Sequence, residues 1–242
     1  MNRTVVALVA CVVVSGCQRP GSPPRIVSDG RVAMGTLFEI QLVVRQTDGR
    51  SDFDALYATV ANLESHVSHY VPTSHVALIS AHAGKGPREV DPSVRELAEL
   101  SIRYAELTHG AFDVTLGQLV DVWKTGSASQ VNYEAIAAAR KASGIEHLKV
   151  ESDGRVGLGI EGIALDFGGI AKGWALDQLQ PQLEERGVGA ALLSFGQSSV
   201  WARGVPPESK SGDPGWTLAL RSPAGGFAGR VTLRDQALSV SS

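Results

Sequence analysis

Alternating apolar and polar residues mark the first strand of this chain. Residues 37–44, Leu-Phe-Glu-Ile-Gln-Leu-Val-Val, partly alternate between the two classes, which predicts a strand with one buried face. The spacing then changes, because Phe53, Leu56 and Val60 recur three and four positions apart. This period is typical of an amphipathic helix, and we expect one over residues 52–69.

Polar residues, proline and glycine locate the ends of the early helices. Ser51 or Asp52 is the expected N-cap of the first helix. Residues 91–92, Asp-Pro, predict the start of a second helix, since Asp caps well and Pro is accepted in the first turn. Residues 109–110, His-Gly, predict its end, and Asn132 is the expected N-cap of an alanine-rich third helix.

The second half of the chain consists mostly of short runs typical of strands. The runs are 147–150, 163–166, 190–195, 200–203, 216–221, 231–233 and 237–240. A helix is expected after Lys172, and Pro181 should kink or split it, at a cost of about 3 kcal/mol if it lies in the helix interior. Helices early and strands late favour a single α+β domain with mostly antiparallel strands.

The N-terminus has the features of an export signal. Arg3 gives a short basic start, and residues 4–14 are almost wholly apolar but too few to span a bilayer, which needs about 20. Small residues then precede Cys17, an ending that resembles a bacterial lipobox. This implies cleavage before Cys17 and lipidation of its sulfur, anchoring the chain to a bacterial membrane. An ordinary signal peptide with a chance cysteine is the alternative.

These features predict three regions along the chain. Residues 1–16 are the signal peptide, residues 17–29 are the lipid anchor and a proline-containing tether, and residues 30–242 are the folded domain. Cys11 and Cys17 are the two cysteines of the sequence, so the mature domain has no disulfide. The net charge is −3 and basic residues do not cluster, which makes nucleic acid an unfavourable partner.

One motif combines an acid, two glycines and a lysine. The stretch Asp166-Phe-Gly-Gly-Ile-Ala-Lys172-Gly-Trp-Ala-Leu-Asp177 follows an apolar run and turns into a helical pattern. Backbone N–H groups at such a turn can hold phosphate, while the carboxylate and the ammonium hold other parts of the same ligand. The stretch lacks G-x-G-x-x-G spacing, so it is not a Rossmann motif. We interpret it as a site for a nucleotide-type ligand.

A second motif and two short ones complete a recognisable order. Residues 108–123 read Thr-x-Gly-Ala-Phe-Asp-x-Thr-x-Gly-x-Leu-x-x-x-Trp, residues 34–36 read Met-Gly-Thr, and residues 68–70 read Ser-x-Tyr. Together with residues 166–177, they resemble the ApbE-type FAD:protein FMN transferase family, in which many members are exported lipoproteins. The resemblance extends from about Arg31 to the end of the chain.

The resemblance implies a fold, a reaction and partners. FAD and Mg²⁺ bind to an ApbE-like α+β domain, and a Thr or Ser hydroxyl of an acceptor protein attacks the FMN-side phosphorus. AMP leaves, and the acceptor carries FMN through a phosphoester. Positioning and charge neutralisation carry most of the catalysis in such phosphoryl-type transfers. The family suggests an acceptor within a membrane electron-transfer complex, on the periplasmic or outer side of the membrane.

The motifs also imply site residues, although they identify no catalytic residue. The positions matching flavin-nucleotide-binding residues of the family are Met34, Tyr70, Ala111, Phe112, Asp113, Asp166 and Lys172. Gly169 matches a metal-ligand position, where only its backbone carbonyl can serve.

The side chains themselves allow both functional and structural roles. Met34 and Tyr70 offer polarizable and aromatic surface to a ring system, or pack in the core. Asp113 and Asp166 accept hydrogen bonds from a ligand, or cap a loop or helix. Lys172 neutralises phosphate, or faces water.

Other candidate sites have weaker patterns. Four histidines suggest zinc, but they fall in two segments and no Cys or carboxylate spacing completes a tetrahedral set; they are His66, His69, His75 and His82. Residues 194–198, Ser-Phe-Gly-Gln-Ser, lack the G-x-S-x-G spacing of a nucleophile elbow.

The chain departs from the family pattern at two places. Residues 196–198 are Gly-Gln-Ser where the family usually has Gly-Gly-Asp, and the sequence stops at Ser242 before the family's later His-x-x-Asp-Pro-x-x-Gly stretch and its Asp and Thr metal ligands. We therefore expect a fragment or a truncated gene product that lacks half of the metal shell. A flavin-binding lipoprotein without transfer activity, and a lipoprotein with a structural or partner-binding role, are the alternatives.

Overall fold

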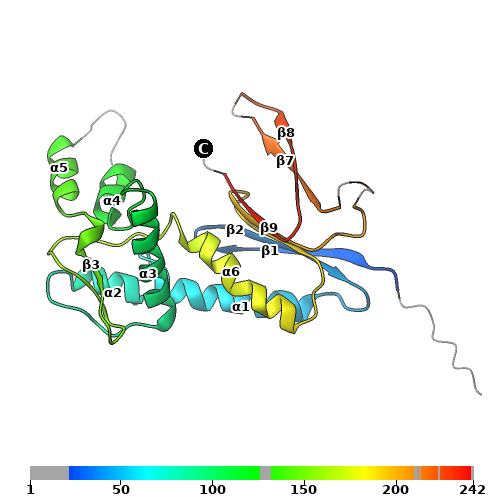
Figure 1. Ribbon diagram of the computed structural model, residues 1–242, viewed down its shortest axis with the longest axis horizontal. Coiled ribbons are helices and arrows are strands. Elements are labelled where there is room, and N and C mark those ends of the chain that lie inside the picture. The colour runs from blue at the N-terminus through cyan, green and yellow to red at the C-terminus, as the bar shows by residue number, and fades with distance from the viewer. Residues whose placement is uncertain (1–21, 126–131, 210–211, 213, 223, 241–242) are drawn as a thin grey trace, which may run out of the picture.

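The computed structural model describes residues 22–125, 132–209, 212, 214–222 and 224–240 (Figure 1). In chain order the elements are β1 (Arg25–Ala33), β2 (Thr36–Val44), α1 (Arg50–Val67), α2 (His75–Ala81), α3 (Pro92–Leu107), α4 (Gly117–Thr125), α5 (Tyr133–Lys141), η1 (Ile145–His147), β3 (Leu148–Val150), β4 (Val156–Leu158), α6 (Ala171–Glu185), β5 (Ala191–Phe195), β6 (Ser199–Arg203), β7 (Trp216–Arg221), β8 (Phe227–Leu233) and β9 (Gln236–Ser239). None of the helices in these ranges is long and apolar enough to cross a membrane. The predicted signal peptide and Cys17 lie outside the described residues.

The central sheet has the strand order β1-β2-β5-β6-β9, and every neighbouring pair is antiparallel. Two further antiparallel pairs, β3-β4 and β7-β8, complete the strands, which confirms the predicted α+β class. The domain boundary predicted at residue 30 falls inside β1, because residues 25–29 already pair with β2. Only the segment before Arg25 can therefore act as a tether to this sheet.

The main core lies between the sheet and helices α1 and α6, which run along the same face in Figure 1. The alternation predicted for residues 37–44 is confirmed, since Phe38, Ile40 and Leu42 are fully buried. The ring of Phe38 stacks on that of Phe195 at a centroid distance of 4.1 Å, and meets the edge of Tyr57 at 5.7 Å. Each such buried side chain contributes about 1.5–3 kcal/mol of transfer free energy to folding.

A smaller core covers the other face of the sheet. The β7-β8 hairpin packs Trp216 and Leu233 against Leu192 and Val200 of the sheet. The indole N–H of Trp216 donates to the carbonyl of Arg203 at 3.0 Å, so the buried donor is satisfied. The sheet is thus covered by helices on one side and by a hairpin on the other.

The predicted helix caps are partly confirmed. Asp91 caps α3 by accepting a hydrogen bond from the N–H of Ser93 at 2.9 Å, and Asn132 caps α5 in the same way. The cap predicted for the first helix is wrong, because α1 begins at Arg50 after Gly49, which has a φ of 73° and no side-chain cap. A Cβ at Gly49 would lie 2.9 Å from Val27, so close packing against β1 sets this start.

The structure also differs from the predicted strand at residues 163–166 and from the predicted split of the helix at Pro181. Residues 163–166 form no strand; Ala164 makes an isolated parallel bridge to Leu116, and the N–H of Asp166 donates to Val114 at 2.8 Å. The segment forms backbone pairs only with residues 114–117 among the described residues, and it lies outside the central sheet. The helix is also not split at Pro181, because α6 continues from Ala171 to Glu185. Leu179 and Leu183, both fully buried, hold the two sides of Pro181 in the core.

Candidate functional site

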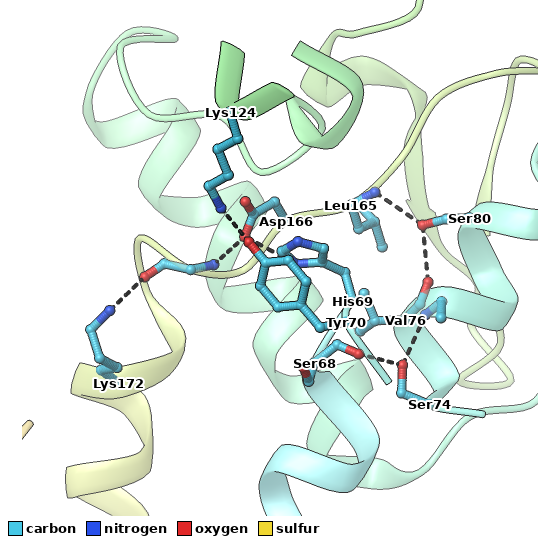
Figure 2. Close-up of polar contacts among 12 residues, drawn as sticks. Ser68, His69, Tyr70, Ser74, Val76, Ser80, Lys124, Leu165, Asp166 and Lys172 are labelled. Carbon is cyan, nitrogen blue, oxygen red and sulfur yellow. Dashed lines mark hydrogen bonds and ion pairs between the residues drawn. The ribbon is translucent and has the colours of Figure 1, made fainter. Parts of the chain in front are cut away.

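Four of the predicted site residues line one pocket of about 500 Å³. Met34, Tyr70, Asp166 and Lys172 come from the β1-β2 turn, the end of α1, the extended segment and the start of α6. Figure 2 shows the last three around the polar centre of this pocket. Residues more than 130 positions apart in the sequence are therefore brought together in one pocket. We call this the Asp166 pocket.

Met34 reaches the pocket because of the turn that carries it. Ala33 and Thr36 pair across the hairpin, so Met34 and Gly35 are the two residues of its loop. Both have positive φ, 49° and 72°, which is the backbone of the tight turns that match strand twist. Met34 packs partly against the main core and lines the pocket with its remaining surface.

Asp166 is held by a backbone donor and faces a histidine ring. Its Oδ1 accepts a hydrogen bond from the N–H of Gly168 at 2.7 Å and lies 3.4 Å from Nδ1 of His69. A Cβ on Gly168 would lie 2.9 Å from the same oxygen, so only glycine fits there without a shift. The Asp166 side chain is 13% exposed, and it is therefore a mostly buried acceptor at the pocket wall.

Tyr70 and His69 form an aromatic wall beside this carboxylate. Their ring centroids are 3.7 Å apart with an interplanar angle of 41°. The Tyr70 hydroxyl accepts a hydrogen bond from the ammonium of Lys124, which comes from α4 and also lies 5.0 Å from the ring centroid (Figure 2). This hydrogen bond is the main cause that raises the pKa of Lys124 above its ordinary value.

Lys172 lies in the first turn of α6 and turns back toward the two glycines. Its Nζ donates to the carbonyl of Gly168 at 3.4 Å. No side chain caps this helix, whose N-cap residue is Ile170. A helix N-terminus with an adjacent lysine favours a negatively charged group by its dipole and by its charge.

Two of the remaining predicted site residues, Phe112 and Gly169, belong to a neighbouring pocket of about 560 Å³. Phe112 and Gly169 both line it, and a Cβ on Gly169 would lie 3.3 Å from the Phe112 ring. Its walls include Trp174, Trp201 and Asp177. Partial burial of the Asp177 carboxyl group raises its pKa above the ordinary value. We call this the Phe112 pocket. Gly168 lines one pocket and Gly169 the other, so the glycine turn lies where the two meet.

Ala111 and Asp113 line neither pocket. Ala111 is exposed, and Oδ1 of Asp113 accepts hydrogen bonds from the N–H and the hydroxyl of Thr115 at 2.8 and 2.7 Å. Thr115 is fully buried, and its Oγ1 accepts in turn from the N–H of Gly144. The structure therefore gives the Asp113 side chain the loop-capping role that was the alternative on sequence grounds.

Sequence reasoning did not single out His69 and Lys124 as binding residues of this pocket. His69 lies inside the Ser-x-Tyr motif and Lys124 directly follows the motif that ends at Trp123. For each residue, the position inside or beside a motif was a usable signal. The contact between Lys124 and Tyr70 could not be predicted in this way, because α4 and the end of α1 approach each other only in the folded chain.

The described residues provide few ligands for a metal. Within these ranges no three His, Cys, Asp or Glu side chains are grouped closely enough to hold an ion. Nδ1 of His66 lies 3.4 Å from Oδ1 of Asp91, and the ring centroids of His66 and His75 are 5.4 Å apart. Near the predicted magnesium ligand Gly169, the Phe112 pocket offers the carboxylate of Asp177. This donor set falls short of a closed magnesium site.

Comparison with known proteins gives a family match over most of the chain. The model of the ApbE family matches residues 34–242. A FAD:protein FMN transferase of Klebsiella pneumoniae is 32% identical over 232 residues, which cover 89% of this chain and 64% of the relative. One of Vibrio cholerae is 27% identical, covering 93% and 66%. The chain thus spans slightly less than two thirds of the length of these relatives.

Solved structures agree with the fold. The flavin transferase ApbE from Vibrio cholerae superposes with a TM-score of 0.78 at 24% identity, covering 89% of this chain and 71% of that one. The ApbE protein from Thermotoga maritima gives 0.74 at 26% identity, covering 88% and 69%.

Proposed function

This chain belongs to the ApbE family, and we propose that it transfers FMN from FAD to a Thr or Ser hydroxyl of an acceptor protein. The observation that carries the proposal is the pair of adjacent pockets that meet at Gly168 and Gly169. A dinucleotide has two bulky ends joined by a pyrophosphate, and two pockets joined at a turn beside Lys172 match that shape and charge. The names of the relatives support the same reaction class.

The residues of this chain have defined tasks in such a transfer. Tyr70 and Phe112 supply aromatic surface, one in each pocket, and Asp166 supplies a hydrogen-bond acceptor. Lys172 supplies positive charge beside the glycine turn. The acceptor oxygen forms a bond to the FMN-side phosphorus, the bond from that phosphorus to the bridging oxygen breaks, and AMP leaves with that oxygen. The hydroxyl proton passes to solvent or to a base.

Mg²⁺ is part of this proposal through the family resemblance. When bound, such an ion neutralises charge on phosphate oxygens. The carbonyl of Gly169 is the ligand expected from the motif, and the described residues do not complete a coordination shell around it. Magnesium often keeps contacts to substrate phosphates and water.

We also propose that the chain is exported and anchored to a bacterial membrane through lipid on Cys17. The support is the apolar run followed by small residues and cysteine. An anchor would keep the domain near a membrane electron-transfer complex, the class of acceptor we propose. Metabolic labelling with a radioactive fatty acid tests this, because C17S should lose both the label and the membrane fraction.

A second candidate function is flavin binding without transfer. The observation that favours it is the turn between β5 and β6, where this chain has Gln197 and Ser198 at the positions of the Gly-Asp that is usual in the family. Gln197 has a φ of 61°, and the hydroxyl of Ser198 is turned to the carbonyl of Phe195 at 3.2 Å. The acidic side chain usual at this turn is therefore replaced by a hydroxyl directed at its own backbone.

One assay distinguishes these functions. The mature protein is incubated with FAD, Mg²⁺ and a peptide that carries an acceptor threonine, with a Thr→Val peptide as control. Release of AMP together with the mass of FMN on the threonine peptide supports transfer. Bound flavin without AMP supports the second function, and absence of flavin binding contradicts both.

A further inference from the structure

Lys124 reaches the Asp166 pocket from α4, directly after the motif that ends at Trp123. It lies in the last turn of α4 and lines the same pocket as Asp166 and Lys172. Figure 2 shows its ammonium directed at the Tyr70 hydroxyl, with Asp166 beside it. The pocket is thus lined by two lysines, one on α4 and one on α6.

The position of α4 is fixed by the segment that carries Asp166. Leu116 bridges Ala164, and the N–H of Gly117, the first residue of α4, donates to the carbonyl of Ala164 at 3.0 Å. Asp166 follows two residues later. The start of α4 and the Asp166 carboxylate therefore share one rigid connection, which sets where the far end of α4 presents Lys124.

The charge of Lys124 is maintained in this position. The hydrogen bond to the Tyr70 hydroxyl is the largest cause that raises the pKa of Lys124, desolvation opposes it, and the charges of Asp166 and Asp121 add to the rise. Its partner Tyr70 is a hydroxyl and not a carboxylate, so this contact orients the ammonium without forming an ion pair. Lys172 is oriented by a carbonyl in the same way.

We propose that Lys124 is a second phosphate-binding lysine of this pocket, and that it shares the pyrophosphate of a dinucleotide with Lys172. Tyr70 directs its ammonium to the pocket. The inference rests on the proposed function, since it takes FAD as the ligand, and it adds a residue that the family motifs do not include. Ammonium groups approaching from two helices suit the two charged phosphates of one pyrophosphate.

The test compares FAD with riboflavin, which has the same ring system but no phosphate. Wild type, K124M, K124R and the control K149M are titrated with each ligand and followed by flavin fluorescence at low and at physiological salt. Lys149 is an exposed lysine in β3, outside both pockets. We expect K124M to bind FAD about tenfold more weakly, with a reduced salt dependence, and riboflavin within about twofold of wild type. K124R should keep most of the affinity, and K149M all of it.

The outcomes separate this inference from the proposed function. If wild type binds FAD and K124M binds it equally well, the inference is wrong and the proposed function stands. Equal losses for FAD and riboflavin would show that Lys124 acts on the ring through Tyr70, which also overturns the phosphate role. If the wild-type protein binds no FAD, both the phosphate role of Lys124 and the proposed function are wrong. Circular dichroism of K124M checks that the fold is kept.

Discussion

Nδ1 of His69 lies 3.4 Å from Oδ1 of Asp166, and the same oxygen accepts the N–H of Gly168 at 2.7 Å. The carboxylate is therefore oriented from two sides, by the end of α1 and by its own glycine turn. The other ring nitrogen of His69, Nε2, is buried and has no hydrogen-bond partner among the described residues. This contact makes His69 a positioning residue for the acceptor at the centre of the pocket.

The first prediction concerns this pair. D166A removes the acceptor and should weaken FAD binding at least tenfold, whereas H69F keeps a ring beside Tyr70 but loses Nδ1 and should weaken it about two- to fivefold. Fluorescence titration measures both. Wild-type affinity in D166A would show that the carboxylate makes no contact with the ligand, and a larger loss in H69F than in D166A would contradict the positioning role.

The second prediction concerns Asp113, which the motif assigns to the ligand and the structure assigns to a loop. D113A removes two hydrogen bonds to Thr115 and should lower the free energy of unfolding by about 1–2 kcal/mol, with FAD affinity within twofold of wild type. Urea denaturation and flavin titration measure the two effects. D153A is the matched control, because Asp153 caps an exposed turn at Arg155 and should change stability much less. Normal stability with lost binding would restore the motif assignment.

The sequence predicted those elements whose burial follows a strict period. β2 alternates because one face of it lies in the core, and Asp91-Pro92 marks the start of α3 by local chemistry alone. Residues 25–29 of β1 were read as part of the tether, since β1 is an edge strand without fully buried residues and so carries no clear alternation. α2 is seven residues long, too short for a helical period to stand out.

The same distinction applies to the site. Met34, Tyr70, Asp166 and Lys172 line one pocket, and each of them lies inside a short motif that could be seen in the sequence. The contact between Tyr70 and Lys124 has no such signal, since it depends on how α4 is placed by Ala164. The sequence left Asp113 open between capping and binding, and the structure shows its carboxylate in a local contact with Thr115, two residues along the chain.

The third prediction concerns the cap of α3 and its dependence on pH. The pKa of Asp91 is lowered, first by the hydrogen bond from the Ser93 hydroxyl, while burial opposes the shift. A folded-state pKa below the unfolded value of about 3.9 means that the stabilisation is complete above that value and is lost as pH falls through the folded pKa. D91A should therefore cost about 1 kcal/mol at pH 7 and less at pH 3.

Urea denaturation of wild type and D91A at the two pH values tests this. N132A is a useful comparison, because Asn132 caps α5 with an uncharged amide and its effect should not depend on pH. An equal cost of D91A at pH 7 and pH 3 would show that the charge of the carboxylate contributes nothing to the cap.

The last prediction concerns the close approach that connects α4 to the Asp166 segment. A Cβ on Gly117 would lie 2.8 Å from the carbonyl oxygen of Ala164 and 3.0 Å from its carbon, and these are backbone atoms that cannot move aside freely. G117A should therefore lower the free energy of unfolding by about 1–3 kcal/mol. It should also weaken FAD binding, because the shift separates the helix that carries Lys124 from Asp166.

Gly173 provides the matched control in a helix. A Cβ there meets nothing within 4 Å, and alanine is the better helix former, so G173A should leave stability unchanged or raise it by up to about 1 kcal/mol. Urea denaturation followed by circular dichroism compares the two variants. A G117A protein as stable as wild type would mean that the segment bearing Asp166 can shift away from α4 at little cost. The pocket would then lack the rigid connection from which the role of Lys124 is argued.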